Sequence, residues 1–390
     1  MEEKGKTNLL GFTREQLADF VEDIGEPRYR AQQIFEWLYT RGATEFRVMT
    51  NLGKAFRAQL ERAAVLQGIT PVHQTHSAHD GTTKFPFELP GGLKIESVLI
   101  PPATAFRDTA QEEDDEQSRL TLCVSTQVGC PLDCAFCATG TMGFFRNLTT
   151  GEIVDQVLQV KRLSRRKITN VVFMGMGEPL LNYDRVMAAS GIIAAGIGIA
   201  LKRITVSTVG IPQRIRRLGD EERRMKLAIS LHSAVDATRS RLMPINRRFP
   251  LAHLMEAVEY YYAKTGERVT YEFIFFDGVN DTEREVKAFI KLARRVPCKI
   301  NVIPYHSIAF TSPSGLAASL RPSPRVEELV RELREHHLTT MIRSSAGEDI
   351  DAACGQLAVR LARTGLARSG LGRTRSARAS ASTHAHQPSP

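Results

Sequence analysis

From residue 119 onwards, short hydrophobic runs alternate with longer amphipathic stretches. Stretches with helical periodicity, such as 151–163 and 251–264, separate strand-like runs at 120–125, 170–174, 203–208, 226–231, 269–276 and 299–304. This alternation is typical of parallel sheets whose strands are connected by helices. About six such units, a further run at 339–343 and a last helix from Asp351 predict an α/β fold. We expect a partial or full (βα) barrel over residues 119–359, with an open doubly wound sheet as the alternative.

The segments before residue 119 have different periodicities. Thr13 and Gln16 form a capping-box pattern, and helical periodicity continues to residue 66, which predicts a helical accessory module over residues 1–66. Residues 67–118 are expected to form a small β region. Turn signals at Asp80-Gly81 and at 90–92 predict a hairpin there, followed by an acidic loop.

Charge and hydropathy narrow the class of protein. The net charge is +9, but residues 360–390 contribute six arginines and no acidic residue, and their small polar composition predicts a basic disordered tail. The first residues are polar, and the longest apolar stretch, 187–201, is too short and glycine-rich to span a bilayer. We therefore expect a cytoplasmic protein without a membrane partner.

Three of the six cysteines lie within eight residues, directly after the first predicted barrel strand. Cys130, Cys134 and Cys137 would occupy the carboxyl edge of the barrel, where active sites are built. Thiolates favour zinc or iron–sulfur centres. Three ligands on a cubane would leave one iron open, whereas structural zinc would need a remote fourth ligand.

Small polar groups follow several of the predicted strands. The glycines of the Met174–Pro179 segment let the backbone approach a ligand, and Glu178 can accept hydrogen bonds from an ammonium group. Together these residues would form a ring suited to a polar cofactor. The candidate cofactor-binding residues are Gly177, Glu178, Ser207, Ser230, Leu231, His232 and Asn301.

The spacing of the three cysteines resembles that of the radical S-adenosylmethionine superfamily. In that superfamily a 4Fe–4S cluster chelates S-adenosylmethionine through its open iron. A closer resemblance is to the RNA adenine methyltransferases of the superfamily, the RlmN and Cfr family, and most to the RlmN branch. The segments that carry it are Leu122–Cys130, Met174–Asn182, Ile229–His232, Cys298–Pro304 and Gly347–Leu357.

The resemblance implies a mechanism that uses two molecules of S-adenosylmethionine per turnover. Cys354 would take a methyl group from the first, as thiolate nucleophilicity permits. The second would be cleaved reductively at the cluster to a deoxyadenosyl radical. This radical would remove a hydrogen atom from the methyl group on Cys354, and the resulting carbon radical would add to the adenine ring. Glu96 would accept the ring proton, and Cys123 would attack the sulfur of Cys354, which leaves a transient disulfide and frees the base.

The same resemblance implies the partners. The substrate would be carbon 2 of an adenine in the peptidyl-transferase region of 23S ribosomal RNA, with transfer RNA as a second candidate. The enzyme would be a monomer that takes electrons from a donor such as flavodoxin. We expect the module at 1–66 to dock RNA, since Tyr29 and Trp37 can stack on bases. Methylation at carbon 8, as by Cfr, is the alternative; a metal-stabilised RNA-binding protein without catalysis is the alternative from another class.

Overall fold

The computed structural model describes residues 5–102, 119–164 and 166–358. The predicted acidic loop at 103–118 and the predicted basic tail at 360–390 lie outside the described residues. Within the described part, no helix is long and apolar enough to cross a membrane.

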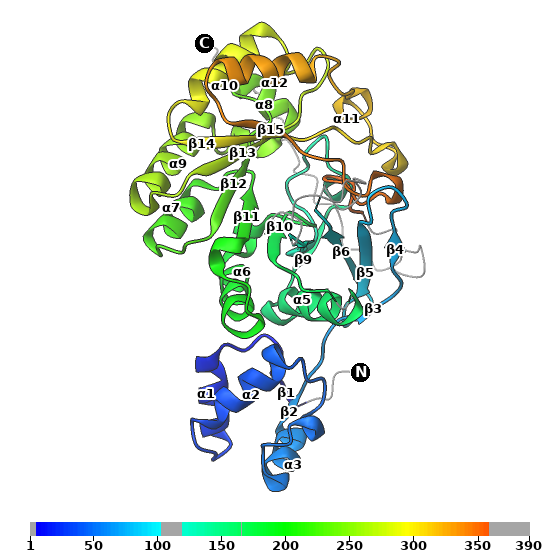
Figure 1. Ribbon diagram of the computed structural model, residues 1–390, viewed down its shortest axis with the longest axis vertical. Coiled ribbons are helices and arrows are strands. Elements are labelled where there is room, and N and C mark those ends of the chain that lie inside the picture. The colour runs from blue at the N-terminus through cyan, green and yellow to red at the C-terminus, as the bar shows by residue number, and fades with distance from the viewer. Residues whose placement is uncertain (1–4, 103–118, 165, 359–390) are drawn as a thin grey trace, which may run out of the picture. The chain divides into compact units, whose positions relative to one another are not determined.

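Seven parallel strands stand side by side in chain order (Figure 1). Because the order never reverses, the doubly wound alternative is wrong, and because the sheet has two ends, the barrel is partial rather than full. The predicted α/β fold class is confirmed. The strands are β7 (Thr121–Cys123), β10 (Asn170–Phe173), β11 (Ile204–Thr208), β12 (Lys226–Ser230), β13 (Val269–Phe273), β14 (Cys298–Val302) and β15 (Thr340–Ile342).

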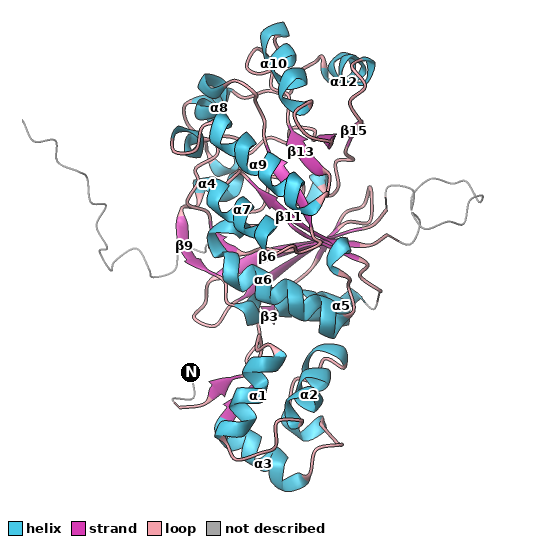
Figure 2. Cartoon of the chain, turned by 90° about the vertical axis from the view of Figure 1, so that its left-hand side faces the viewer, coloured by secondary structure: helices cyan, strands magenta, loops and turns pink. Residues whose placement is uncertain are grey.

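Helices connect these strands and cover the outer face of the sheet (Figure 2). Helix α5, in the connection from β7 to β10, begins with a cap in which the Glu152 amide donates to Thr149 Oγ1 at 3.1 Å and the Thr149 amide donates to the Glu152 carboxylate at 2.8 Å. Reciprocal bonds of this kind satisfy two amides that the helix leaves free. The helices are α5 (Thr150–Ser164), α6 (Tyr183–Ile192), α7 (Pro212–Asp220), α8 (Asp236–Leu242), α9 (Leu251–Thr265), α10 (Glu283–Ala293), α11 (Leu316–Ser319) and α12 (Val326–Glu335).

The predicted β region does not stand apart from the barrel. Strands β5 (Thr83–Glu88) and β6 (Lys94–Ile100) form an antiparallel hairpin, and β6 pairs with β7, so that Val98 lies opposite Cys123. The short strands β3 (Thr70–Pro71) and β4 (Thr75–His76) pair with β5. The hairpin therefore extends the barrel sheet by further strands, and β6 is an interior strand, not an edge.

The N-terminal segment folds into the expected helices. These are α1 (Arg14–Asp23), α2 (Arg30–Phe35), which continues as a π-helical turn, and α3 (Lys54–Ala63). The predicted capping box of Thr13 with Gln16 is present at the start of α1. Strands β1 (Thr7–Asn8) and β2 (Ala64–Val65) pair beside them. The side chain of Tyr29 is exposed, whereas the Trp37 indole donates to Asn51.

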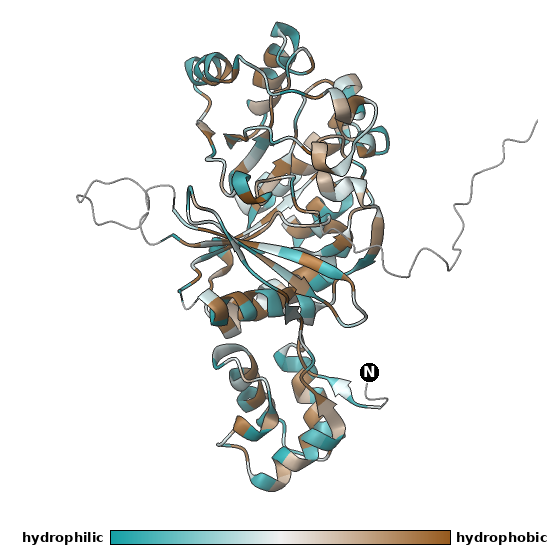
Figure 3. Ribbon diagram, turned by 90° about the vertical axis from the view of Figure 1, so that its right-hand side faces the viewer, coloured by the Kyte–Doolittle hydropathy of each residue, from teal (hydrophilic) through white to brown (hydrophobic). Residues whose placement is uncertain are grey.

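The two faces of the barrel strands differ in polarity, because successive side chains alternate between faces. Positions that face the helices, such as Val171, Val206 and Ile300, are apolar and fully buried. Positions that face the lumen include Thr121, Thr205, Thr270, Glu272 and Asn301. Figure 3 shows hydrophilic and hydrophobic positions intermixed along strands and helices alike. The core therefore lies between sheet and helices, and the lumen is lined by polar as well as apolar side chains.

The last helix predicted from Asp351 is wrong over the described residues. A 3₁₀ turn covers Glu348–Ile350, and an irregular segment follows to residue 358. Asp351 has φ of 52° and Gly355 has φ of 86°, which is the left-handed region that ends helices. The segment that carries Cys354 is a loop held by specific contacts.

Candidate active site

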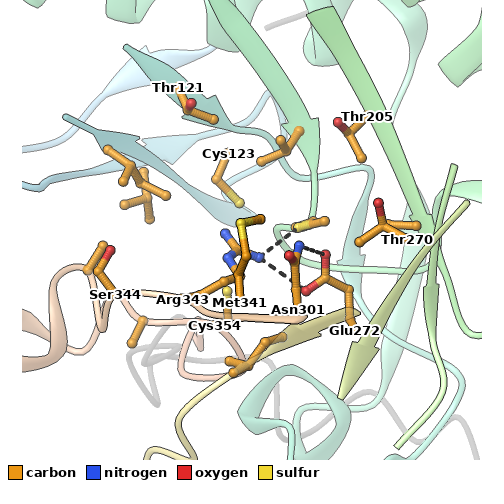
Figure 4. Close-up of a pocket in the computed structure, with 18 of the residues that line it drawn as sticks. Thr121, Cys123, Thr205, Thr270, Glu272, Asn301, Met341, Arg343, Ser344 and Cys354 are labelled. Atoms are coloured by element: carbon orange, nitrogen blue, oxygen red, sulfur yellow. Dashed lines mark hydrogen bonds and ion pairs between the residues drawn. The ribbon is translucent and has the colours of Figure 1, made fainter. Parts of the chain in front are cut away.

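The lumen of the barrel contains a cavity of about 640 Å³. The strands contribute Cys123, Glu272 and Asn301 to its wall, and the C-terminal loop contributes Arg343 and Cys354. Figure 4 shows these side chains directed toward the same space from opposite sides. The two cysteines that are 231 positions apart in the sequence are thus brought to one cavity.

The three-cysteine loop is positioned by a hairpin that sequence reasoning missed. Strand β8 (Gln127–Gly129) pairs with β9 (Phe144–Asn147), and the cysteines lie between them, before and at the start of the one-turn helix α4 (Ala138–Thr141). The Cys130 amide donates to the Gly143 carbonyl at 3.0 Å, and the Ala138 amide donates to the Gly355 carbonyl at 2.7 Å. The second bond ties the three-cysteine loop to the segment that carries Cys354.

The three thiols share one electrostatic environment. Burial raises the pKa of Cys130 to about 12, and the charge of Cys137 adds to the increase. Burial also raises the pKa of Cys134 and of Cys137, and for Cys134 the charges of the other two cysteines contribute. Neighbouring thiols that oppose each other's ionisation need a cation to become thiolates. All six cysteines are free.

The donor set fits an iron–sulfur cluster in residue type and placement. Three sulfurs on one loop supply soft ligands, and thiolates are the usual ligands of such clusters. In the described part of the chain, no three His, Cys, Asp or Glu side chains are already arranged as a metal site. A bound cluster would therefore require the cysteine side chains to adjust within their loop, as expected where metal binding and local folding are coupled.

Cys123 and Cys354 differ in their surroundings. Cys123 is buried on β7, and burial, with a contribution from the charge of Cys354, raises its pKa to about 12. Cys354 is partly buried in the loop after the 3₁₀ turn. The helix predicted from Asp351 would have placed a helix start beside Cys354, but no helix begins there. The positive charge near both sulfurs comes from Arg343 instead.

Arg343 lies just beyond the end of β15 and was not identified from the sequence. The charge of Cys354, and then those of Glu272 and Cys123, raise the pKa of its guanidinium, which outweighs the effect of burial. Arg343 Nη1 lies 3.5 Å from Glu272 Oε2, and Asn301 Nδ2 donates to Glu272 Oε1 at 3.0 Å (Figure 4). Because Glu272 interacts with both Asn301 and Arg343, it holds the Arg343 guanidinium in place near the two cysteines.

Glu96 lies on interior strand β6 and is buried. Burial raises its pKa, which the charge of Lys84 opposes, and Lys84 Nζ lies 3.8 Å from Glu96 Oε1. Lys84 Nζ also donates to the carbonyl of Asp351 at 3.2 Å, and the amide of Ala358 donates to Glu96. Glu96 Oε2 has no partner among the described residues. The carboxylate therefore lies next to the loop that carries Cys354, and one of its oxygens has no hydrogen-bond partner among the described residues. Glu96 is not among the residues that line the cavity.

Glu178 and Gly177 occupy the loop after β10. The carboxylate of Glu178 is buried and accepts from the amides of Leu180 and Val209, each at 3.0 Å. Burial raises its pKa to about 7. Gly177 has φ of 99°, and a side chain there would collide with Gln127. The glycine is thus required by the turn that places Glu178.

The remaining candidates lie at the ends of β11, β12 and β14. His232 is buried, and its backbone adopts the left-handed conformation, with φ of 55°. Its Nδ1 accepts from the Ile274 amide at 3.1 Å. Burial lowers its pKa to about 3, so the ring is neutral. Leu231 is fully buried, its amide donates to the Glu272 carbonyl at 3.0 Å, and its carbonyl accepts from the Ser233 amide at 2.8 Å. Of the seven candidates, Asn301 lines the cavity, and Gly177, Glu178, Ser207, Ser230, Leu231 and His232 do not.

His306 is another lining residue that was not identified from the sequence. It lies in the loop after β14, is buried, and lines the cavity. Its Nδ1 lies 3.3 Å from Glu348 Oε1, on the loop that carries Cys354. It lies beyond the Cys298–Pro304 segment that carries the resemblance, and no local pattern marks it.

Two known protein families match stretches of this chain. Residues 124–293 match the radical SAM superfamily, and residues 7–66 match the family described as ribosomal RNA large subunit methyltransferase N-terminal domain. A protein of Salinibacter ruber named probable dual-specificity RNA methyltransferase RlmN is 43% identical, over 90% of this chain and 94% of its own length. The chain belongs to the RlmN family.

Further relatives agree with the assignment to the RlmN family. The dual-specificity RNA methyltransferase RlmN of Pelobacter propionicus is 40% identical over 90% of this chain and 96% of its own length. The crystal structure of a radical SAM methyltransferase from Sphaerobacter thermophilus superposes with a TM-score of 0.79 at 40% identity, over 90% of this chain and 99% of that one. The predicted family and the predicted class of enzyme, a radical SAM RNA methyltransferase, are confirmed.

Proposed function

We propose that this chain methylates carbon 2 of an adenine in 23S ribosomal RNA, with transfer RNA as a second substrate. The observation that carries the proposal is the placement of Cys123 and Cys354 on one cavity, with Arg343 beside both sulfurs. A structural metal protein that only binds RNA needs neither cysteine nor the buried cation. The names of the relatives, which state dual specificity for RNA, support both substrates.

The residues in place fit the proposed cofactors. Cys130, Cys134 and Cys137 would hold a 4Fe–4S cluster. Asn301 on the cavity wall, with Gly177, Glu178, Ser207, Ser230, Leu231 and His232 at the ends of neighbouring strands, would contact S-adenosylmethionine. Glu178 has a carboxylate that can accept from an ammonium group, because its lone pairs exceed its two amide donors. When bound, the cluster supplies an electron that cleaves S-adenosylmethionine to a deoxyadenosyl radical.

The chain's own groups carry the transfer. The Cys354 thiolate, stabilised by Arg343, displaces the methyl group from a sulfonium and holds it as a thioether. The methyl carbon on Cys354 gives up a hydrogen atom to the deoxyadenosyl radical and joins the ring as a methylene group. Glu96 then accepts the ring proton as one electron leaves the adduct, and its raised pKa makes it a better base. Cys123 loses its proton and its sulfur forms a bond to the sulfur of Cys354, the bond between Cys354 and the carbon breaks, and the carbon takes up a proton. The base leaves methylated, and a disulfide remains.

The function is tested by anaerobic reconstitution with iron, sulfide and S-adenosylmethionine, followed by mass spectrometry of 23S ribosomal RNA and transfer RNA. We expect one additional methyl group on an adenine, at carbon 2 by comparison with synthetic standards. Methylation at carbon 8 would identify the Cfr activity instead. RNA that binds but gains no methyl group from the fully loaded protein would favour the non-catalytic alternative.

Replacing Cys134 with alanine is expected to give a colourless protein without reductive cleavage of S-adenosylmethionine. Removing one of three ligands leaves too few to hold the cluster. Iron content and visible absorbance measure the loss, and Cys298→Ala is the matched control, because Cys298 lies on β14 and donates to the Ala293 carbonyl. An active, iron-free Cys134→Ala protein that contains zinc would contradict the cluster.

Replacing Arg343 with glutamine is expected to slow methyl uptake by Cys354 about 10- to 100-fold. A charged hydrogen-bonding partner contributes about 1.5–3 kcal/mol. Mass spectrometry of the Cys354 peptide over time gives the rate, and Arg343→Lys, which keeps the charge, should recover part of it. Equal rates in all three proteins, with equal cluster content, would remove Arg343 from the mechanism.

A further inference from the structure

Basic side chains surround the end of the cavity that lies at the amino edge of the barrel. Lys226 is the first residue of β12, Lys299 is the second residue of β14, and Arg119 and Arg268 lie just before β7 and β13. All four line the same cavity as the two cysteines. Since parallel strands begin at one edge of a sheet, the four side chains form a group, which we call the basic mouth.

Within the part of the chain that the structure describes, the charges of the basic mouth are compensated only in part. Within the described residues, none of the four side chains has a carboxylate within 4.0 Å. Burial lowers the pKa of Lys226, and the charges of Arg119 and Lys299 lower it further, against an opposing effect of Glu267. Glu272, the other acidic residue of the wall, is paired with Arg343. A cavity lined by one sign of charge concentrates ions of the opposite sign.

Short side chains line the lumen between the basic mouth and the cysteines. Thr121, Thr205 and Thr270 project into it from three strands, as Figure 4 shows, and Ala228 lies beside them. One cavity therefore extends from the basic mouth to Cys123, and Cys123, which is only 7% exposed, is better placed for contact with a small molecule than with a folded protein.

The proposed reaction creates a need for such access. Each turnover ends with a disulfide between Cys123 and Cys354, and two electrons must restore the thiols before the next methyl group is taken up. A thiolate must approach one of the two sulfurs along the S–S axis. RNA that presents its base to Cys354 would occupy the space on that side.

We infer that the basic mouth is a binding and entry site for small thiols that carry a negative charge, and that these reduce the disulfide between Cys123 and Cys354. The inference rests on the proposed function. One thiolate attacks a protein sulfur and forms a mixed disulfide, which releases the other cysteine as a thiolate that takes up a proton. A second thiol then attacks the mixed disulfide, releases the remaining cysteine and leaves as the oxidised dimer.

The experiment compares three small thiols that differ in charge. These are 2-mercaptoethanesulfonate, 2-mercaptoethanol and cysteamine, which are anionic, neutral and cationic. The cluster-loaded enzyme is brought to the disulfide state in two ways, by one turnover with RNA and by mild oxidation with diamide. Reduction is followed by alkylation and mass spectrometry of the Cys123 and Cys354 peptides, and each rate is divided by that of the same thiol with a small uncharged disulfide.

After this correction, we expect the anionic thiol to reduce the disulfide about tenfold faster than the cationic thiol, in line with steering by a charged cleft. Lys299→Glu, at an exposed position, should remove or invert the preference, and Lys226→Gln should weaken it. Lys161→Glu, on the exposed face of α5, makes the same charge change outside the cavity and should leave it intact. The inference would be overturned if Lys299→Glu kept the same preference for the anionic thiol as wild type. It would also be overturned if Lys161→Glu lost that preference as fully as Lys299→Glu.

The two routes to the disulfide separate this inference from the proposed function. If turnover with RNA forms no disulfide but the diamide-oxidised protein shows the charge preference, the mechanism fails and the entry site stands. If turnover forms the disulfide, but the rate of its reduction depends neither on the charge of the thiol nor on the substitutions in the basic mouth, the entry site is wrong and the mechanism is supported.

Discussion

Replacing Cys354 with alanine is expected to abolish methylation of RNA and to prevent any methyl group from appearing on the protein. The thiolate is the group that accepts the methyl, and alanine has no nucleophile. The change is small and the loop is held by backbone contacts, such as the Ala138 amide on the Gly355 carbonyl at 2.7 Å, so we expect the fold to survive. Mass spectrometry of the tryptic peptide, with a methyl-labelled donor, measures the loss, which should exceed about 10³-fold.

The control for this prediction is the cluster. Cys354→Ala should still bind iron and cleave S-adenosylmethionine slowly without coupling to RNA, because Cys130, Cys134 and Cys137 are unchanged. Methyl transfer to RNA at an undiminished rate would show that the methyl group does not pass through Cys354.

Replacing Cys123 with alanine is expected to leave methylation of Cys354 intact and to trap the RNA covalently on Cys354. Cys123 provides the sulfur that breaks the bond between Cys354 and the base, so without it the adduct cannot resolve. Its buried position on β7 and a pKa raised to about 12 suit a thiol that is held still and gives up its proton only when the partner sulfur is at hand. Denaturing gel electrophoresis with labelled RNA should show the shifted band, and turnover should fall to a single event per enzyme.

The double variant Cys123→Ala with Cys354→Ala is the matched control and should trap no RNA. Normal turnover by Cys123→Ala would contradict the role of Cys123. A bond located on Cys123 in the Cys354→Ala protein would show that the two roles are reversed.

Local patterns in the sequence predicted the elements of the fold well, because they depend on neighbours in the chain. The Thr13 and Gln16 capping box, the turn at Asp80-Gly81 and the alternation of strands with helices follow from spacing and periodicity. The segment after Asp351 was predicted as a helix because its composition permits one. The contact between Gly355 and Ala138, on a distant loop, favours the irregular path.

The class of chemistry could be predicted from the sequence, because three cysteines at short spacing, and a strand-end cysteine with a distant partner, are recognised from residue type and motif. The groups that surround those sulfurs became apparent in the folded chain. Arg343, Glu272 and His306 carry no local signal, and they reach the cysteines because parallel strands bring their ends to one lumen. The same closure gathers Arg119, Lys226, Arg268 and Lys299 into one mouth, although the chain separates them by up to 180 positions. Charge and burial act through space, so the electrostatics of this site arise only when the sheet has curled.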